Sequence, residues 1–126
     1  MSYVEDAEQV ISKLSRDKRG NLQMTTSQIR GLLSGISDIY NDVVILKSDE
    51  IPEEIQKRIM YLKVQFVYEA GRDNNVKEFI EKSKILDNQV GPSIDKAITS
   101  KKEFIAMERY MEALVAYHRY HGGRGE

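Results

Sequence analysis

The last third of the sequence carries basic side chains at helical spacing. Lys101, Arg109 and Arg119 fall on one side of a predicted helix, with Ala113 and Ala116 between them. Fixed positive charges among small side chains allow a second backbone, from a protein or a nucleic acid, to come close. This side of the helix is therefore a candidate surface for binding a polyanion or another protein.

Arg30 is a second basic candidate, on the outer face of another predicted helix. The face also carries short hydroxyl and amide side chains, namely Ser27, Ser34, Ser37 and Asn41. Guanidinium and hydroxyl groups can donate hydrogen bonds to phosphate without reading base identity. A plain solvated face is the alternative interpretation, and the sequence alone does not decide between the two.

Lys63 falls between two apolar stripes of one predicted helix. The main stripe contains Ile55, Ile59, Leu62 and Phe66, and the second contains Met60, Val64 and Val67. A lysine flanked by apolar residues either extends its ammonium group to water or donates to a phosphate in a groove between helices.

Each remaining basic candidate also has a structural interpretation. Arg72 can bind phosphate or satisfy the carbonyl groups that end its helix. Arg109 can pair with Glu112, and Arg119 can complement the helix dipole. The charged loop around Arg16, Lys18 and Arg19 is interpreted as solvent-exposed.

Catalytic chemistry has little support in the sequence. His118 and His121 are three residues apart, but no carboxylate lies at a suitable helical spacing beside them to complete a metal site. The chain has no cysteine. Gly31 and Gly35 lie inside a predicted helix and are interpreted as close-packing positions, not as a phosphate-binding loop. We therefore predict a protein that is not an enzyme and uses neither a metal nor a cofactor.

The composition suits one soluble domain spanning residues 1–126. The 19 Lys and Arg residues balance 20 Asp and Glu residues, so any affinity for RNA must come from a local patch. The longest aliphatic run, Val43 to Leu46, is far shorter than the ~20 residues that span a bilayer. No secretory signal is visible at the N-terminus. We expect a cytoplasmic protein that is not associated with a membrane.

Apolar residues recur with a period near 3.6, which predicts a compact all-α bundle of about five helices. Tyr110 and Tyr117 are expected at the edge of its core. The predicted helices run from Val4 to Ser15, from Thr25 to Val43, from Pro52 to Gly71, from about Asn75 to Leu86 and from Ser100 to Gly122, with a short helical turn from Ser93 to Ile98. Capping boxes are predicted for the pairs Thr25–Gln28, Asn75–Glu78 and Ser100–Glu103.

Three segments carry a family resemblance: residues 22–30 (LQMTTSQIR), 64–72 (VQFVYEAGR) and 109–118 (RYMEALVAYH). In this order they resemble the small subunit of the type III-A CRISPR effector (Csm) complex. The resemblance is poorer in residues 87–100 and in the tail, where Tyr120 and His121 stand in place of two aromatic residues.

The resemblance implies a small helical bundle that stacks in several copies and is not the nuclease. The expected partners are target RNA, the guide–target duplex and other effector subunits, with self-association into a filament or dimer. Carried over by motif, the expected RNA-binding residues are Arg30, Lys63, Arg72, Arg109 and Arg119. The alternatives are an architectural protein that binds only proteins, and a metal protein built on His118 and His121.

Overall fold

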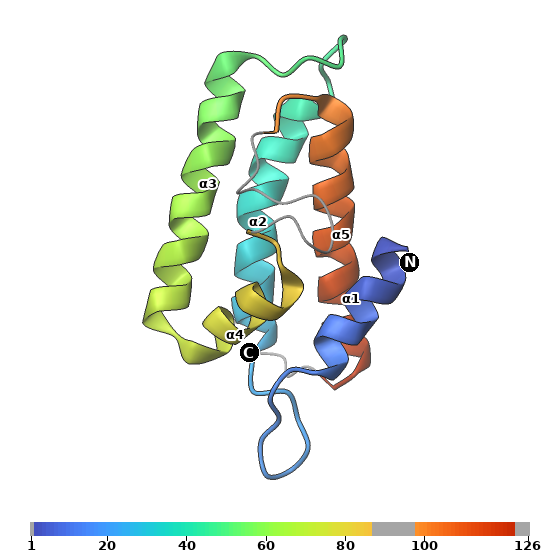
Figure 1. Cartoon of the computed structure of the whole chain (residues 1–126), viewed down its shortest axis with the longest axis vertical. Coiled ribbons are helices and arrows are strands. Elements are labelled where there is room, and N and C mark those ends of the chain that lie inside the picture. Colours follow the sequence, from blue (N-terminus) through green and yellow to red (C-terminus); the bar gives the residue numbers. More distant parts are fainter. Residues whose placement is uncertain (1, 87–97, 123–126) are drawn as a thin grey trace.

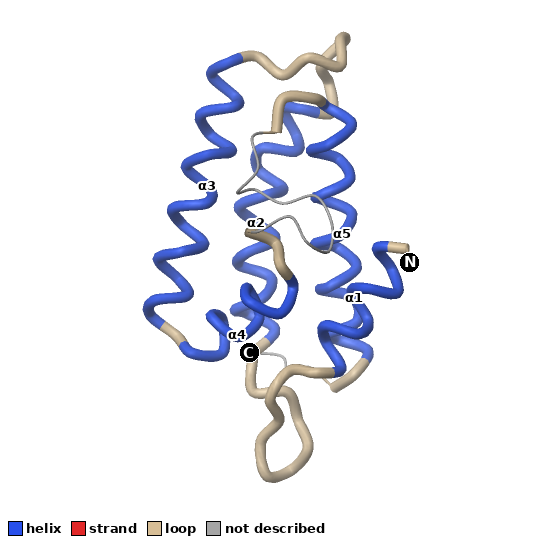
Figure 2. The backbone as a smooth tube through the Cα atoms, viewed as in Figure 1, coloured by secondary structure: helices blue, strands red, loops and turns tan. Residues whose placement is uncertain are grey.

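The computed structural model describes residues 2–86 and 98–122. It contains the helices α1 (Tyr3–Ser12), α2 (Thr26–Val43), α3 (Glu53–Arg72), α4 (Asn74–Ser83) and α5 (Lys101–Tyr120). No strand is assigned in these residues (Figure 2), so the predicted all-α fold is confirmed. The helical turn expected between Ser93 and Ile98 lies, apart from Ile98, outside the described residues.

Helix α2 occupies the middle of the molecule, with α3 and α5 alongside it and antiparallel to it (Figure 1). The short helices α1 and α4 lie across one face of this layer, where α1 packs on α5 and α4 packs on α3. None of the helices in the described part of the chain combines the length and the hydrophobicity that crossing a lipid bilayer requires.

Local capping chemistry sets the start of several helices. The predicted capping box of α2 is confirmed: Gln28 N donates to Thr25 Oγ1 (3.1 Å), and Thr25 N donates to Gln28 Oε1 (2.9 Å). At α5, Glu103 N donates to Ser100 Oγ (3.0 Å), but the Glu103 carboxylate accepts from Thr99 N instead of closing the box. These bonds satisfy backbone donors that a helix start leaves without an intrahelical partner.

The start of α4 differs from the prediction. Asp73 is its N-cap, and Asp73 Oδ1 accepts from the backbone N–H groups of Asn75 and Val76. Glu78 does not act as a capping partner, because its carboxylate reaches across the bundle to the backbone N–H (3.0 Å) and the hydroxyl (2.7 Å) of Ser15. A long-range contact of this kind has no signal in the local sequence.

Other helix boundaries shift by a few residues. Pro52 precedes α3 as its N-cap instead of lying in its first turn, and α3 continues past Gly71 to Arg72. Helix α1 ends at Ser12, earlier than the expected Ser15, because the chain then turns into the loop that leads to α2. Gly122, with φ = +98°, takes the left-handed conformation predicted for the end of α5.

The core receives buried side chains from all five helices. Its largest fully buried side chains are Tyr110, Phe66, Phe79 and Phe104. The expectation that Tyr110 lies at the core edge is wrong: its ring is fully buried, and its hydroxyl donates to Ser83 O at 2.6 Å. This hydrogen bond satisfies the hydroxyl group, which explains how a tyrosine can occupy the centre of the core.

The two glycines inside α2 have different surroundings. A Cβ atom at Gly35 would lie 2.9 Å from Leu62 Cδ1 of α3, so Gly35 is a close-packing position as predicted. A Cβ atom at Gly31 would meet nothing within 4 Å, so the close-packing interpretation of Gly31 is wrong. The two sites therefore offer a matched test of how closely α2 and α3 pack.

We expect Gly31→Ala to raise the free energy of unfolding by about 0.5–1 kcal/mol, because alanine favours the helix and the added methyl group meets open space. Gly35→Ala gains the same helix propensity but presses on the buried Leu62, and overpacking costs about 1–3 kcal/mol. Urea unfolding of the two variants measures the difference. Equal stabilisation by both substitutions would show that α2 and α3 are not in close contact at Gly35.

Candidate nucleic-acid interface

Arg109 and Arg119 lie on the outer side of α5, and both side chains are exposed. They are ten residues apart, or about 15 Å along the helix axis. Neither is hydrogen-bonded or ion-paired to another residue in the part of the chain that the structure describes. Ala116, between them, is also exposed. Both guanidinium groups are therefore available to an external partner.

Lys101 does not belong to this exposed surface, although the sequence places it on the same helix side. Its side chain is half-buried, and Lys101 Nζ donates to Leu46 O at 2.8 Å. The backbone N–H of Lys101 also donates to Asp49 O. Lys101 thus joins the start of α5 to the segment that follows α2, which is a structural role.

Arg30 projects from the exposed side of α2. The neighbouring Ser27, Ser34 and Asn41 are exposed as predicted, and Ser37 is half-buried. Arg30 makes no hydrogen bond or ion pair with any residue that the structure describes. Its surroundings are therefore those expected of a surface that can donate to phosphate oxygens.

Lys63 is half-buried on α3 and already interacts within the molecule. It does not lie between two buried stripes, because Met60, Val64 and Val67 are 44%, 56% and 51% exposed. The main stripe is the buried one, with Ile59, Leu62 and Phe66 in the core. Lys63 therefore lies at the boundary between the core-facing side of α3 and its outer side.

Arg72 lies at the C-terminal end of α3 and lines a groove between α2 and α3. The groove has a volume of about 790 Å³ and is also lined by Ser27, Gln28 and Gly31 of α2. Gln28 Nε2 donates to Asp73 Oδ2 (2.9 Å), which holds the two helix ends together. Arg72 contacts Glu69 (3.4 Å) and lies 5.6 Å from the centre of the Tyr68 ring.

The five candidate residues do not form one cluster. Arg72 and the first turns of α2 lie at the same end of the α2–α3 pair. Arg109 and Arg119 are on α5, which is on the other side of α2 from α3 (Figure 1). Lys63 is on α3 and separate from both groups. Arg72 is also exposed but contacts Glu69, so the structure leaves Arg30, Arg109 and Arg119, on two neighbouring helices, as the exposed candidates that make no hydrogen bond or ion pair with a described residue.

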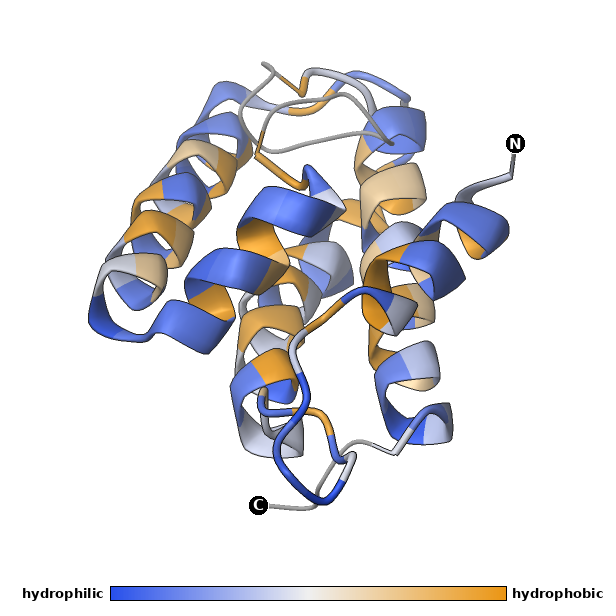
Figure 3. Cartoon of the chain, turned by 60° about the horizontal axis from the view of Figure 1, so that its bottom comes forward, coloured by the Kyte–Doolittle hydropathy of each residue, from blue (hydrophilic) through white to orange (hydrophobic). Residues whose placement is uncertain are grey.

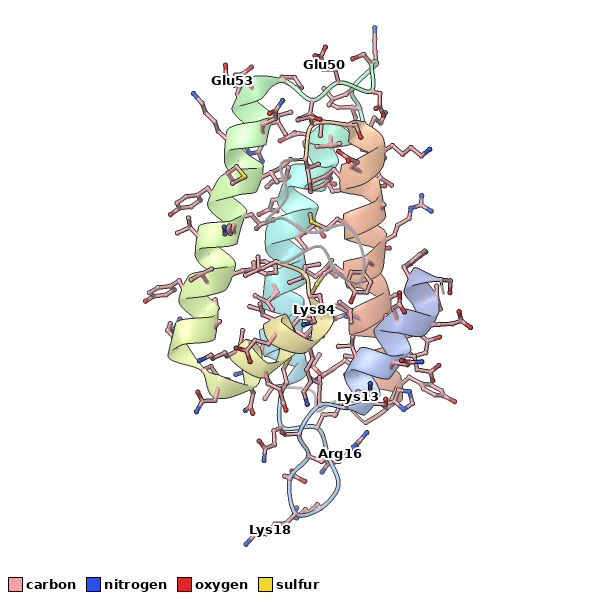
Figure 4. The ribbon with its side chains drawn as sticks, in the orientation of Figure 1. Lys13, Arg16, Lys18, Glu50, Glu53 and Lys84 are labelled. Carbon is pink, nitrogen blue, oxygen red and sulfur yellow. The ribbon has the colours of Figure 1, made fainter. Side chains whose placement is uncertain are left out.

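A further basic group lies at the end of the molecule where α1 leads into α2. Figure 4 shows Lys13, Arg16 and Lys18 there, with Glu50 and Glu53 at the opposite end. Arg16 Nη1 donates to Gly20 O (2.6 Å) and to His121 O (3.3 Å), so this arginine stabilises the loop. Lys18 and Arg19 are exposed, as the sequence suggested for this loop. In the sequence, the basic residues Arg16, Lys18 and Arg19 were the signal that indicated a positively charged loop at this end of the molecule.

The two histidines make separate structural contacts. His118 is fully buried, and its Nε2 lies 2.6 Å from Met24 O, while Nδ1 has no partner. Burial lowers the pKa of His118, which favours the neutral ring. His121 Nε2 instead contacts Glu8 Oε2 of α1 at 3.1 Å. In residues 2–86 and 98–122, no group of three or more histidine or acidic side chains could hold a metal ion.

Glu108 of α5 is a buried acid that the sequence analysis did not single out. It is only 3% exposed. Burial, together with the hydrogen bond and the negative charge of the neighbouring Glu112, raises the pKa of its carboxyl group to about 7, although the charge of Arg109 acts in the opposite direction. Near neutral pH this position therefore holds a carboxyl group that readily keeps its proton.

Taken together, these features describe an all-helical protein with exposed cations on neighbouring helices, an arrangement suited to binding. The sequence matches the family described as Csm2 Type III-A over residues 3–124. It is 44% identical over 123 residues to a CRISPR system Cms protein Csm2 from Streptococcus thermophilus, with 98% of this chain and 93% of the relative covered.

A second relative is the CRISPR system Cms protein Csm2 of Mycobacterium tuberculosis (strain ATCC 25618 / H37Rv), 35% identical over 118 residues, with 94% of this chain and 90% of the relative covered. A third, from Enterococcus italicus, is 35% identical over 116 residues, with 87% of this chain and 81% of the relative covered. The chain belongs to the Csm2 type III-A family. The resemblance seen in the three sequence segments is thereby confirmed.

The buried Glu108 predicts a pH-dependent stability. Because its pKa is raised from 4.5 to about 7, its contribution to stability is fully present below about pH 4.5 and is lost as the pH rises through 7. We expect Glu108→Gln to raise the free energy of unfolding at pH 8 by about 1–3 kcal/mol and to change it little at pH 5. Urea unfolding at the two pH values measures the effect.

The matched control is Glu81→Gln, which removes an exposed carboxylate from α4. This substitution should have nearly the same small effect at both pH values. A Glu108→Gln variant whose stability follows the wild type from pH 5 to pH 8 would show that Glu108 ionises normally in the folded protein.

Proposed function

We propose that this chain is a non-catalytic small subunit of a type III-A CRISPR RNA-guided complex in the cytoplasm. In this proposal it binds the phosphate backbone of the target RNA and of the guide–target duplex without sequence specificity. Membership of the Csm2 family supports the proposal that the chain is a subunit of this complex. The exposed arginines on α2 and α5, which make no hydrogen bond or ion pair with a described residue, are the observation that carries the proposed RNA contact.

The register of α2 and α5 favours a common role for these arginines. His118 of α5 contacts Met24 at one end of α2, and Lys101 contacts Leu46 beyond the other end. Because the helices are antiparallel, Arg30, six residues after Met24, is level with the stretch of α5 between Arg109 and Arg119. A phosphate backbone lying across the two helices could therefore contact donors from both.

The overall charge fits binding by many weak contacts. With 19 basic and 20 acidic residues, one copy has no excess of positive charge to attract RNA. Two to four phosphate contacts per copy give weak, salt-dependent binding, as a rough expectation. Several copies aligned on one strand raise the local concentration of binding sites, so the assembly binds far more tightly than one copy.

The proposed partners therefore include further copies of this chain as well as other effector subunits. Charges at the two ends of the molecule support stacking of copies end to end. Lys13 and Lys18 lie at one end, and the carboxylates of Glu50 and Glu53 lie at the other (Figure 4). Near-neutral copies also repel one another less than strongly basic copies would.

Lys63 and Arg72 are lower-ranked candidates in this proposal. Lys63 is half-buried and already interacts within the molecule, and Arg72 contacts Glu69 and Tyr68. Either side chain would have to exchange an internal contact for a phosphate. Arg30, Arg109 and Arg119 bind phosphate in this proposal without that exchange.

A second candidate function is an architectural module that binds only proteins. The exposed apolar side chains on the outer side of α3 favour this alternative, because such a face is typical of a protein interface. The two functions differ in one observable property, which is whether substitutions of exposed arginines change RNA binding by the assembled complex.

The test is an Arg30→Ala, Arg109→Ala double variant in the reconstituted effector complex. We expect the affinity for target RNA to fall about tenfold or more, and the slope of log affinity against log salt to become shallower by about 0.7–0.9 per lost contact in each copy. Filter binding between roughly 50 and 200 mM salt measures both quantities.

The control removes the same charge elsewhere, through Lys47→Ala and Lys77→Ala, at two exposed lysines outside α2 and α5. This variant should keep the wild-type affinity and salt slope. If the arginine variant assembles normally and retains RNA as the control does, the architectural function is the better description.

A further inference from the structure

Tyr120, at the end of α5, is an exposed aromatic side chain that the proposed function does not use. It is 79% exposed. Its ring meets the ring of His121 edge-on, with the centroids 5.1 Å apart, and His121 in turn stacks on Tyr117 at 6.0 Å. The contact of His121 with Glu8 of α1, at 3.1 Å, holds this group in place. Tyr120 therefore has a supported ring that is largely open to solvent.

A tight turn in the loop between α1 and α2 carries Arg19 at its tip. Asp17 N donates to Asn21 O (2.8 Å), and Gly20 N donates to Asp17 O (3.0 Å). Asp17 Oδ1 also accepts from the backbone N–H groups of Arg19 and Asn21. Gly20, with φ = +86°, takes the left-handed conformation that favours glycine. These features fix the backbone that carries Arg19.

Arg16 joins this turn to the end of α5. Its Nη1 atom donates to Gly20 O (2.6 Å) and to His121 O (3.3 Å), so the two carbonyl groups meet at one nitrogen atom. Arg19 directly precedes the first of these residues in the sequence, and Tyr120 directly precedes the second. The tip of the turn and the end of α5 therefore form one surface, which we call the Tyr120 surface.

The Tyr120 surface has two available cations. The side chains of Arg19 and Arg119 are exposed, and neither makes a hydrogen bond or an ion pair with a described residue. The carboxylates nearby are engaged, because Asp17 accepts from two backbone groups and Glu8 contacts His121. An exposed aromatic ring beside available guanidinium groups is the combination that binds unpaired nucleic acid.

We propose that the Tyr120 surface binds an unpaired nucleotide of the RNA, whose base stacks on Tyr120 while Arg19 and Arg119 bind the adjoining phosphates. A base inside a duplex has its faces covered by its neighbours, so unpaired RNA is required for stacking on a protein ring. This contact rests on the proposed RNA binding and adds to it a preference for single-stranded RNA. Where copies stack through the end that carries Lys18, the outermost copy leaves the surface open.

An apolar protein partner fits the Tyr120 surface less well. The other large apolar side chains that are exposed in the described residues lie at the start of α1, at the end of α2 and on α3. Figure 3, in which this end of the molecule comes forward, shows the loop between α1 and α2 as mainly hydrophilic. Tyr120 is therefore not part of an apolar patch of the kind that marks a protein interface.

Two target RNAs test the contact in the reconstituted effector complex. One pairs with the guide along its whole length, and the other also carries unpaired uridines at both ends. The wild-type complex should bind the extended RNA about fivefold or more tightly than the paired RNA, and Tyr120→Ala should remove this gain. Tyr120→Phe keeps the ring and should bind as the wild type does. Tyr61→Ala, at a tyrosine of α3 that is 62% exposed, is the matched control and should keep the gain.

The salt dependence separates the base contact from the phosphate contacts. For the extended RNA, Arg19→Ala should make the slope of log affinity against log salt shallower by about 0.7, the value for one phosphate contact with a single strand. Tyr120→Ala should lower the affinity without changing this slope, because the ring carries no charge. Lys47→Ala, which removes an exposed charge elsewhere, should change neither quantity.

Equal binding of the two RNAs by the wild-type complex overturns the proposal, as does a Tyr120→Ala variant that keeps the gain. A Tyr120→Ala variant that no longer assembles, while Tyr120→Phe does, assigns the surface to a neighbouring protein and also overturns it. The fully paired RNA keeps the two proposals apart. The Arg30→Ala, Arg109→Ala variant tests the proposed function on that RNA, whereas the Tyr120 variants should leave its binding unchanged.

Discussion

The antiparallel pairing of α2 with α5 is the constraint on which the rest of the molecule depends. Two side chains fix its register at opposite ends: His118 contacts Met24 O at 2.6 Å, and Lys101 donates to Leu46 O at 2.8 Å. Between these points the faces of both helices are filled by buried apolar residues. Because the interior is close-packed, a shift of one helix along the other would disturb every contact between them.

Much of the fold could be predicted from the sequence because its signals are local. The pair Thr25 and Gln28 marked the start of α2, and Gly122 marked the end of α5. The capping residues of α4 were misassigned, because the carboxylate of Glu78 accepts hydrogen bonds from Ser15, which is 63 residues away in the chain. Periodicity likewise placed Tyr110 on the apolar side of α5 but not at the centre of the core, since its depth depends on Ser83 of another helix.

The candidate site was predictable to a similar extent. Helical spacing correctly placed Arg30, Arg109 and Arg119 on exposed faces, because exposure follows from the opposite face being apolar. It did not show that α3 has one buried stripe and one exposed stripe, since both consist of apolar residues. Which of the two stripes is buried depends on the side of α3 that the neighbouring helices occupy. This burial pattern changed the interpretation of Lys63. Whether these residues contact RNA stays a prediction.

The packing of the first helix against the last has a consequence for biosynthesis. Helix α5 supplies the contact surface for both α1 and α2, so the chain cannot complete its core until the residues up to Tyr120 have left the ribosome. Until then, the apolar sides of the earlier helices remain in water and are open to chaperones or to aggregation. Termination of translation before α5 would therefore yield a chain that lacks the surface against which α1 and α2 pack.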